Sequence, residues 1–236
     1  MPASLLGRGL DLLFPRRCVH CGRFGDVLCA ECEQTMSPCS AGKRCPNCCA
    51  SWDGEHNCPR CFGWDALDGA SVAVDMAGAA RKVVHGLKYR YIRSLAPVMA
   101  RQIDRLPSGF DVAFAIPLHR SRLRQRGFNQ AQVLLDLLAW PAGEGKLERV
   151  RKTDTQVGMD IGQRRANIAG AFAYTGPSLR GMSVALIDDV VTTGATANEC
   201  ARVLRDYGAR AVRIYAFART NYDPTPGLPI DEWATS

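Results

Sequence analysis

The sequence predicts an α/β domain built on a parallel sheet flanked by helices and preceded by a small cysteine-rich module. Of the eleven cysteines, ten lie between Cys18 and Cys61. Beyond them come short unbroken apolar runs, which are typical of strands buried on both faces of a parallel sheet. With 236 residues, 47% of them hydrophobic, the chain is long enough for one domain with a substantial core. We therefore expect a cysteine-rich module at 1–65, the α/β domain at 66–220 and an irregular tail at 221–236.

The cysteine-rich module comes first in the chain, and eight of its cysteines form four C-x-x-C pairs. Two residues between two thiolates let a tight turn aim both sulfurs at one ion, and two pairs complete the tetrahedral shell of a structural zinc site. Four pairs predict two structural Zn²⁺ ions, bound by two ribbons in tandem or by a crossed combination of the pairs. The predicted zinc ligands are Cys18, Cys21, Cys29, Cys32, Cys45, Cys48, Cys58 and Cys61.

Alternatives to this zinc assignment stay open. The paired cysteines could be unligated thiols or small disulfides, although their regular spacing favours zinc. Cys39, Cys49, His20 and His56 could substitute as ligands, but spare cysteines and surface histidines explain them more simply.

No apolar run approaches the roughly 18 residues needed to cross a bilayer, and no export signal is evident. We therefore expect no membrane insertion and a reducing, cytoplasmic location.

Five short segments, most of them apolar runs, are predicted to be the strands of the sheet. They lie at 70–74, 111–116, 147–150, 184–188 and 211–217. Pro117 breaks the second run, and His119 and Arg120 begin a basic segment that we expect to form a loop. After it, RGFNQ at 126–130 is predicted to open a helix. Ligands collect beyond the carboxyl ends of strands in an open parallel sheet, so the basic loop is expected to face a pocket.

The most informative segment is VALIDDVVTTGAT at 184–196. Its apolar run predicts a strand with the acidic pair at its end, and a helical pattern begins after Thr196. Free backbone N–H groups at the helix start, the positive end of the helix dipole and threonine hydroxyls together suit a phosphate group. Two carboxylates beside that phosphate suit ribose hydroxyls or Mg²⁺. The alternative is an ordinary buried strand capped by polar turn residues.

Charge along the chain points to an anionic ligand as well. The whole chain carries a formal charge of +7, with 30 Lys+Arg against 23 Asp+Glu. Between Arg81 and Arg126 there are eleven basic residues against two acidic ones, which gives this window alone +9. Aromatic side chains at Tyr89, Tyr91 and Phe128 lie among these cations, a mixture that also suits single-stranded DNA.

The thirteen residues at 184–196 resemble the motif that binds phosphoribosyl pyrophosphate (PRPP) in type I phosphoribosyltransferases. The resemblance implies that the two acidic side chains hold the ribose 2′- and 3′-hydroxyls and that the following residues wrap the 5′-phosphate. The PRPP-binding residues predicted in this way are Asp188, Asp189, Val190, Val191, Thr192, Thr193, Gly194, Ala195 and Thr196.

A longer series of segments resembles the competence protein F (ComF) family. From about Phe14 to Arg219 it comprises FPRRC, the C-x-x-C pairs, HGLKYR, PLHRSRLRQRGFNQ, TQ, RRANIAGAF and VALIDDVVTTGAT. The resemblance implies a double zinc ribbon followed by a type I phosphoribosyltransferase-like domain. Members of the family are linked to DNA uptake during natural transformation or described as amidophosphoribosyltransferase-like. The ribbons precede the domain where these transferases usually carry an acceptor-binding hood, so they are expected to help choose the acceptor.

The resemblance implies transfer of phosphoribosyl from PRPP, bound with Mg²⁺, to an unknown acceptor that we expect to be a nitrogen nucleophile. Candidates for stabilising the pyrophosphate leaving group are Arg120, Lys88, Arg126 and His119. Candidates for a lid over the pocket are Gln156, Arg164, Arg165 and Asn167. The alternative function is a non-catalytic competence protein that uses the same fold to bind single-stranded DNA or a partner in the DNA-uptake machinery.

Overall fold

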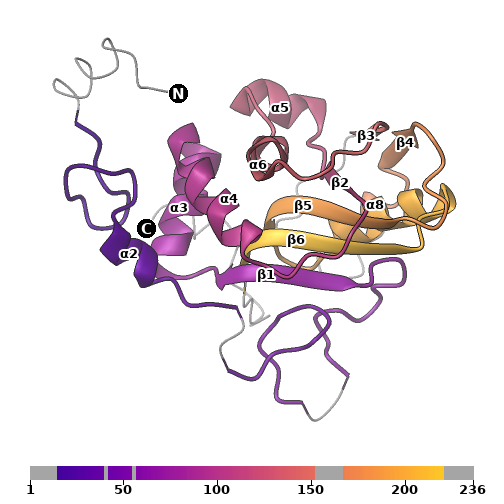
Figure 1. Ribbon diagram of the computed structural model, residues 1–236, viewed down its shortest axis with the longest axis horizontal. Helices are drawn as coiled ribbons and strands as arrows, with labels where there is room; N and C mark the ends of the chain where they lie inside the picture. Colours follow the sequence, from indigo (N-terminus) through magenta and orange to yellow (C-terminus); the bar gives the residue numbers. More distant parts are fainter. Residues whose placement is uncertain (1–14, 40–41, 55–56, 152–166, 221–236) are drawn as a thin grey trace.

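The computed structural model describes residues 15–39, 42–54, 57–151 and 167–220. Its centre is a parallel sheet of four strands in the order β1-β6-β5-β2 (Figure 1). The strands are β1 Gly69–Asp75, β2 Val112–Ala115, β5 Ser183–Val191 and β6 Ala211–Arg219. Every neighbouring pair is parallel. The predicted parallel sheet flanked by helices is confirmed.

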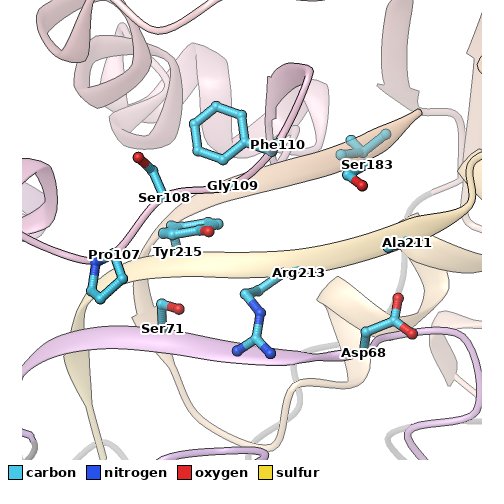
Figure 2. A pocket seen from close by; sticks show the side chains of 11 residues that line it. Asp68, Ser71, Pro107, Ser108, Gly109, Phe110, Ser183, Ala211, Arg213 and Tyr215 are labelled. Carbon is cyan, nitrogen blue, oxygen red and sulfur yellow. The ribbon is translucent and has the colours of Figure 1, made fainter.

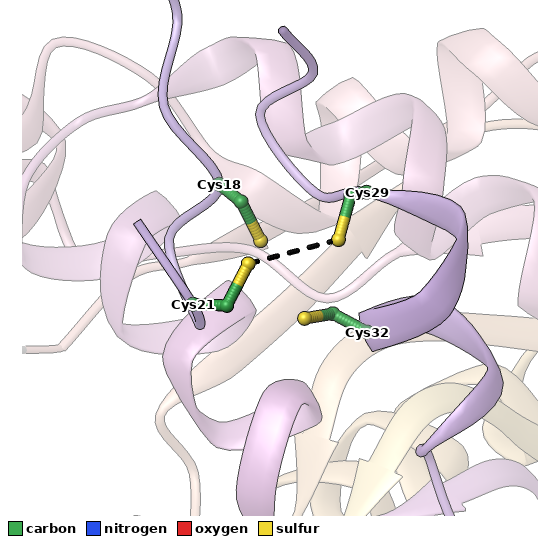
Figure 3. Close-up of side chains that lie close together, drawn as sticks. All are labelled: Cys18, Cys21, Cys29 and Cys32. Atoms are coloured by element: carbon green, nitrogen blue, oxygen red, sulfur yellow. Dashed lines mark hydrogen bonds between the residues drawn. The ribbon is translucent and has the colours of Figure 1, made fainter. Parts of the chain in front are cut away.

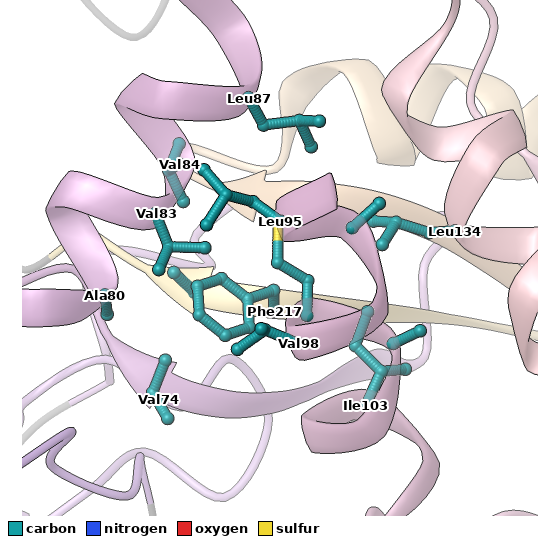
Figure 4. Close-up of a cluster of buried hydrophobic side chains, with 14 of the residues drawn as sticks. Val74, Ala80, Val83, Val84, Leu87, Leu95, Val98, Ile103, Leu134 and Phe217 are labelled. Atoms are coloured by element: carbon teal, nitrogen blue, oxygen red, sulfur yellow. The ribbon is translucent and has the colours of Figure 1, made fainter. Parts of the chain in front are cut away.

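Helices cover both faces of this sheet. One face carries α3 (Gly78–Tyr89), the short 3-10 helix η1 (Arg93–Leu95), α4 (Ala96–Asp104) and α6 (Gln130–Leu138). Figure 4 shows side chains of α3 and α4 meeting Phe217 of β6 in this core. The other face carries α8 (Ala195–Asp206), whose Cys200 and Leu204 pack against strand residues such as Leu186. Because the central strands are buried from both sides, nearly every position in β6 is apolar.

The predicted strand at 147–150 does not belong to the parallel sheet. Its residues form β3 (Lys146–Arg149), which pairs antiparallel with β4 (Phe172–Thr175) in a separate two-stranded sheet. Within β3 only Leu147 is buried. A strand in the middle of a parallel sheet needs apolar side chains on both faces, and this segment offers them on one face. No strand was predicted for β4.

The acidic pair does not end β5, as predicted, because the strand continues to Val191. Asp188 is paired with Ala216 of β6, and Val190 with Ala218, so the ladder passes through both acidic residues. At the other end of the segment, α8 begins at Ala195 rather than after Thr196. The predicted loop between strand and helix is therefore shorter than expected.

The basic segment after β2 is a helix, α5 (Arg120–Arg126), where a loop was predicted. His119 is its N-cap, and Gly127 ends it with a left-handed φ of 75°. The helix predicted to open at 126 therefore begins only at Gln130, where the side chain of Asn129 accepts a hydrogen bond from the Ala131 N–H. An exposed arginine-rich helix lacks the apolar periodicity from which helices are recognised.

The cysteine-rich residues lie in two places beside the domain (Figure 1). The first ribbon, which includes α2 (Ala30–Gln34), packs next to α3 and shares its core through Leu28 and Met36. The second ribbon runs along the outer edge of β1, where the Cys39 N–H donates to Ala73 O and the Ala70 N–H donates to Asn47 O. The edge strand of the sheet is thereby covered.

Among the described residues, no helix combines the length and the apolar character needed to span a membrane.

Candidate functional site

The residues at 192–196, here called the threonine loop, connect the carboxyl end of β5 to the first turn of α8. Gly194 is the N-cap of α8 and has a left-handed φ of 74°. The loop lines a small cavity of about 40 Å³ together with Asp188 and Ile214. The first backbone N–H groups of a helix have no acceptor within the helix, and the dipole makes this end positive. The loop is therefore built to receive an anion.

The two acidic side chains of β5 lie beside the threonine loop but have different surroundings. Neighbouring residues of a strand point to opposite faces, and the contacts agree. Asp189 Oδ1 lies 2.9 Å from Lys88 Nζ of α3, whereas Asp188 interacts electrostatically with Cys200 of α8. The Asp189 N–H also donates to Asp188 Oδ1 at 2.8 Å. One carboxylate thus has a cation beside it, and the other faces the helix that follows the loop.

Burial shapes the acid pair strongly. Asp189 is only 4% exposed, and its second oxygen, Oδ2, has no hydrogen-bond partner among the described residues. Desolvation raises the pKa of Asp188 well above its usual range, and the neighbouring Asp189 carboxylate raises it further, while Lys88 acts in the opposite direction. A ligand with hydroxyl donors, or a cation, would supply what these oxygens lack.

Of the four candidate pyrophosphate groups, Lys88 contacts the acid pair, and Arg126 lies near Tyr89, the residue that follows Lys88. Lys88 lies in the last turn of α3, and the guanidinium of Arg126, the last residue of α5, lies 5.8 Å from the centre of the Tyr89 ring. Arg120 begins the same helix, which separates it from Arg126 by about 9 Å along the axis. His119 accepts a hydrogen bond from the Ser121 N–H at its Nδ1 and thereby caps α5.

Of the four lid candidates, Gln156, Arg164 and Arg165 lie outside the described residues. Asn167 is described, and its backbone carbonyl accepts a hydrogen bond of 3.0 Å from Arg151 Nη2. The same guanidinium nitrogen donates to Ala169 O, so Arg151 is bonded to described residues that follow position 166.

The eight paired cysteines form two tetrads in tandem. Cys18, Cys21, Cys29 and Cys32 form the first tetrad (Figure 3), and Cys45, Cys48, Cys58 and Cys61 form the second. Within each tetrad the four Sγ atoms lie within 4.8 Å of one another. The crossed combination is not the one found, and Cys39 and Cys49 lie outside both tetrads.

The spacing of the sulfurs fits zinc. The Sγ atoms lie 3.8 Å apart in Cys21 and Cys29, and 3.7 Å apart in Cys48 and Cys58. A tetrahedron with Zn–S bonds of about 2.3 Å has edges of about 3.8 Å. Four sulfurs at this spacing match a closed structural site, which holds the fold and leaves no position for a substrate.

Comparison with known proteins agrees with these two parts of the molecule. Residues 9–62 match the family profile of the double zinc ribbon domain, and residues 94–236 match that of the phosphoribosyl transferase domain. The second match alone covers more than half of the chain. It contains β5, the threonine loop and α8.

Individual proteins with similar sequences show which family this chain belongs to. Competence protein F of Haemophilus influenzae is 37% identical over 110 residues, which cover 44% of this chain and 48% of that protein. The DNA utilization protein YhgH of Salmonella typhi is 32% identical over 180 residues, covering 69% of this chain and 78% of that one. Competence protein ComFC of Bacillus subtilis is 33% identical over 112 residues, covering 44% of this chain and 42% of that one. This chain belongs to the ComF family.

The match to the first of these relatives spans about half of its length, whereas the match to YhgH spans more than three quarters. The family profiles and the relatives together establish the ComF family and the phosphoribosyltransferase-type fold. The structure adds two cysteine tetrads of the structural zinc type.

Two residues at the site of this ComF-family protein were missed by sequence reasoning. Trp64 Nε1 donates a hydrogen bond of 2.9 Å to Thr193 O in the threonine loop. Arg219, fully buried at the end of β6, donates from Nη1 to Thr192 O at 2.7 Å. A charged residue at the end of an apolar strand was a signal for Arg219. Nothing in the sequence near Trp64 indicates a partner so far along the chain.

A larger cavity of about 490 Å³ lies at the amino ends of the strands, away from the threonine loop (Figure 2). Asp68, Ser183 and Ala211 line it, and these residues stand at or next to the amino ends of β1, β5 and β6. Because all four strands are parallel, the threonine loop, which follows the carboxyl end of β5, lies at the other end of the strands. The larger cavity is therefore separate from the candidate site.

Proposed function

We propose that this ComF-family protein is a phosphoribosyltransferase that binds PRPP at the acid pair and the threonine loop. The observation that supports this most strongly is the succession of a half-buried carboxylate (Asp188), a buried one (Asp189) and a left-handed glycine N-cap at the carboxyl end of a central strand. The 5′-phosphate would lie against the loop N–H groups, and the ribose hydroxyls would donate to Asp188 and Asp189.

The reaction would replace a C–O bond by a C–N bond at ribose C1. The bond between C1 and the pyrophosphate oxygen breaks with its electron pair on pyrophosphate, and a nitrogen nucleophile supplies the pair for the new bond. Negative charge grows on the leaving group, so Lys88 and Arg126 would stabilise it as fixed cations. Mg²⁺, bound by oxygen ligands among the acid pair and the substrate, would supply further charge neutralisation.

The remaining parts of the proposal concern the cysteine-rich module and the division of the chain. We assign the eight tetrad cysteines to two structural Zn²⁺ ions. The module would occupy 1–65, the transferase domain 66–220 and a tail 221–236. Reduced, metal-bound thiols fit a reducing, cytoplasmic compartment.

Isothermal titration calorimetry with PRPP and Mg²⁺ tests the proposal. The wild-type protein should bind PRPP saturably, and the double variant Asp188→Asn/Asp189→Asn should lose that binding by at least about 100-fold. Asp136→Asn, which removes one exposed carboxylate from α6, is the control for loss of surface charge and should bind as the wild type does. Failure of the wild type to bind PRPP, or unchanged binding by the double variant, would contradict the proposal.

A second candidate function is binding of single-stranded DNA. It is favoured by exposed Tyr89 and Tyr91 at the end of α3, where Arg126 lies over the Tyr89 ring. Aromatic and basic side chains together stack on bases and follow a phosphate backbone. The relatives named for competence and DNA utilization point the same way. DNA binding should weaken steeply with salt and survive the double Asp variant, which distinguishes it from PRPP binding.

A further inference from the structure

The segment that follows the second cysteine tetrad reaches directly into the candidate PRPP site. The Trp64 N–H donates to the carbonyl of Cys61, the last cysteine of the tetrad, at 3.0 Å. Three residues beyond that cysteine, the Trp64 side chain donates to Thr193 O at 2.9 Å. The indole also lies against Gly194, since a Cβ added there would lie 2.2 Å from Trp64 Cζ2. One side chain thus connects the tetrad to the backbone of the threonine loop.

The residues just beyond Trp64 hold the helix that follows the loop. Asn198 of α8 accepts hydrogen bonds at Oδ1 from the N–H groups of Ala66 and Leu67, both at 3.1 Å, and donates from Nδ2 to Asp65 Oδ1 at 2.6 Å. Asn198 is buried, so these bonds are shielded from water. The first turns of α8 are therefore fixed to the same segment that contacts the loop.

Arg219 provides a second connection. Its guanidinium is fully buried, donates to Thr192 O, and interacts electrostatically with Cys48 of the second tetrad. Its Nε and Nη2 atoms have no hydrogen-bond partner among the described residues. Four thiolates around Zn²⁺ carry a net charge of about −2, which a buried guanidinium would offset. The residues present therefore fit a metal-bound second tetrad.

The first ribbon packs elsewhere. Its Leu28 and Met36 lie in the core beside α3, and Glu33 of α2 accepts hydrogen bonds from Arg101 and Gln102 of α4. The two ribbons therefore have different neighbours, and the contacts with the threonine loop described above come from the second.

We propose that Trp64 is a positioning residue for the threonine loop, and that metal binding at the second tetrad and PRPP binding at the loop favour each other. The metal would fix the chain around Cys48 and Cys61. Trp64 would then hold the carbonyl of Thr193, and Arg219 would hold the carbonyl of Thr192. Coupling of this kind is reciprocal, so each ligand must raise the affinity for the other by the same factor. The inference rests on the proposed function.

The first experiment compares two tryptophans of the second ribbon in the zinc-loaded full chain. Trp52 and Trp64 are both half-buried against the cluster of Cys45, Cys48, Ala50 and Cys58, but Trp64 also packs against the core beneath α8. Trp64→Phe should weaken PRPP binding about tenfold in calorimetry, whereas Trp52→Phe should leave it unchanged. Trp64→Ala, which also removes the ring from Gly194, should weaken it further.

The second experiment measures the reciprocal effect without any turnover. The protein is equilibrated with a zinc chelator, with and without PRPP, then pulse-labelled with a thiol-alkylating reagent, and each tetrad is followed by mass spectrometry of its peptides. PRPP should raise the zinc affinity of the second tetrad about tenfold, leave the first tetrad unchanged, and lose this effect in Trp64→Phe.

The outcomes separate the inference from the proposed function. If the wild type binds PRPP but Trp64→Phe binds it equally well, the inference is wrong and the PRPP site stands. Equal protection of both tetrads by PRPP would also overturn the inference, because it would reflect general stabilisation of the fold. If the wild type does not bind PRPP, the proposed function fails and the inference fails with it.

Discussion

At the scale of single residues, two neighbouring carboxylates with different surroundings define the candidate site. Asp189 is buried with the Lys88 ammonium 2.9 Å from its Oδ1. Asp188 has the raised pKa, because burial disfavours its charged form and the Asp189 carboxylate lies close by. A buried charge without adequate compensation destabilises the folded state. Asp188 is thus a residue whose charge opposes folding and, in the proposed function, serves ligand binding.

This reasoning predicts a pH-dependent gain in stability for Asp188→Asn. A pKa raised by folding means that the folded wild type loses stability as pH rises from the usual aspartate range through the raised value. The asparagine variant has no such titration, so its advantage over the wild type should be larger at pH 8 than at pH 5. Denaturant unfolding of the ligand-free proteins at both pH values measures the difference.

The control for this prediction is Asp136→Asn, which removes an exposed carboxylate from α6. Its unfolding free energy should stay within about 0.5 kcal/mol of the wild type at both pH values. A stability difference between Asp188→Asn and the wild type that is the same at pH 5 and pH 8 would contradict the account of Asp188.

At the scale of elements, the site depends on how tightly β5 is joined to α8. Gly194 has a φ of 74°, which L side chains rarely adopt, and its Cα faces the Trp64 indole. Both the turn and the close approach therefore require glycine at this position. The glycine allows the strand to pass into the helix while the indole supports the loop from outside.

Gly194→Ala should destabilise the protein by about 1–3 kcal/mol and weaken PRPP binding at least about tenfold. Gly208→Ala is the matched control, because Gly208 follows the other end of α8, has a φ of 97°, and would bring a Cβ within 3.0 Å of Arg180 Cα. The control should lose similar stability and keep PRPP affinity. Thermal unfolding and calorimetry of both variants test this, and normal PRPP binding by Gly194→Ala would speak against it.

Elements with strong patterns were predicted well, and those shaped by their neighbours were not. The apolar run of β5 gave a clear strand signal, but its end was misplaced because pairing with β6 carries the ladder through Asp188. Helix α5 was predicted as a loop because none of its residues is buried. β3 was assigned to the wrong sheet, since only its pairing with β4 decides where it belongs.

At the scale of the whole molecule, the sequence indicated two zinc ribbons and a transferase fold but not how they meet. Spacing alone predicted two zinc sites, since C-x-x-C pairs are local features, but which pairs share a site is known only from the structure. The hydrogen bond from Trp64 to Thr193 joins residues 129 positions apart, and no local sequence pattern predicts it. The separate docking of the two ribbons, beside α3 and along β1, follows from tertiary packing in the same way.

The measurement that tests the central claim most directly is a crystal structure of the zinc-loaded protein grown with PRPP and Mg²⁺. The account predicts electron density for the 5′-phosphate against the backbone of residues 192–196 and for the ribose hydroxyls beside Asp188 and Asp189. PRPP bound at another surface, such as the cavity lined by Asp68 and Ser183, or crystals with no density at the threonine loop under saturating PRPP, would contradict it.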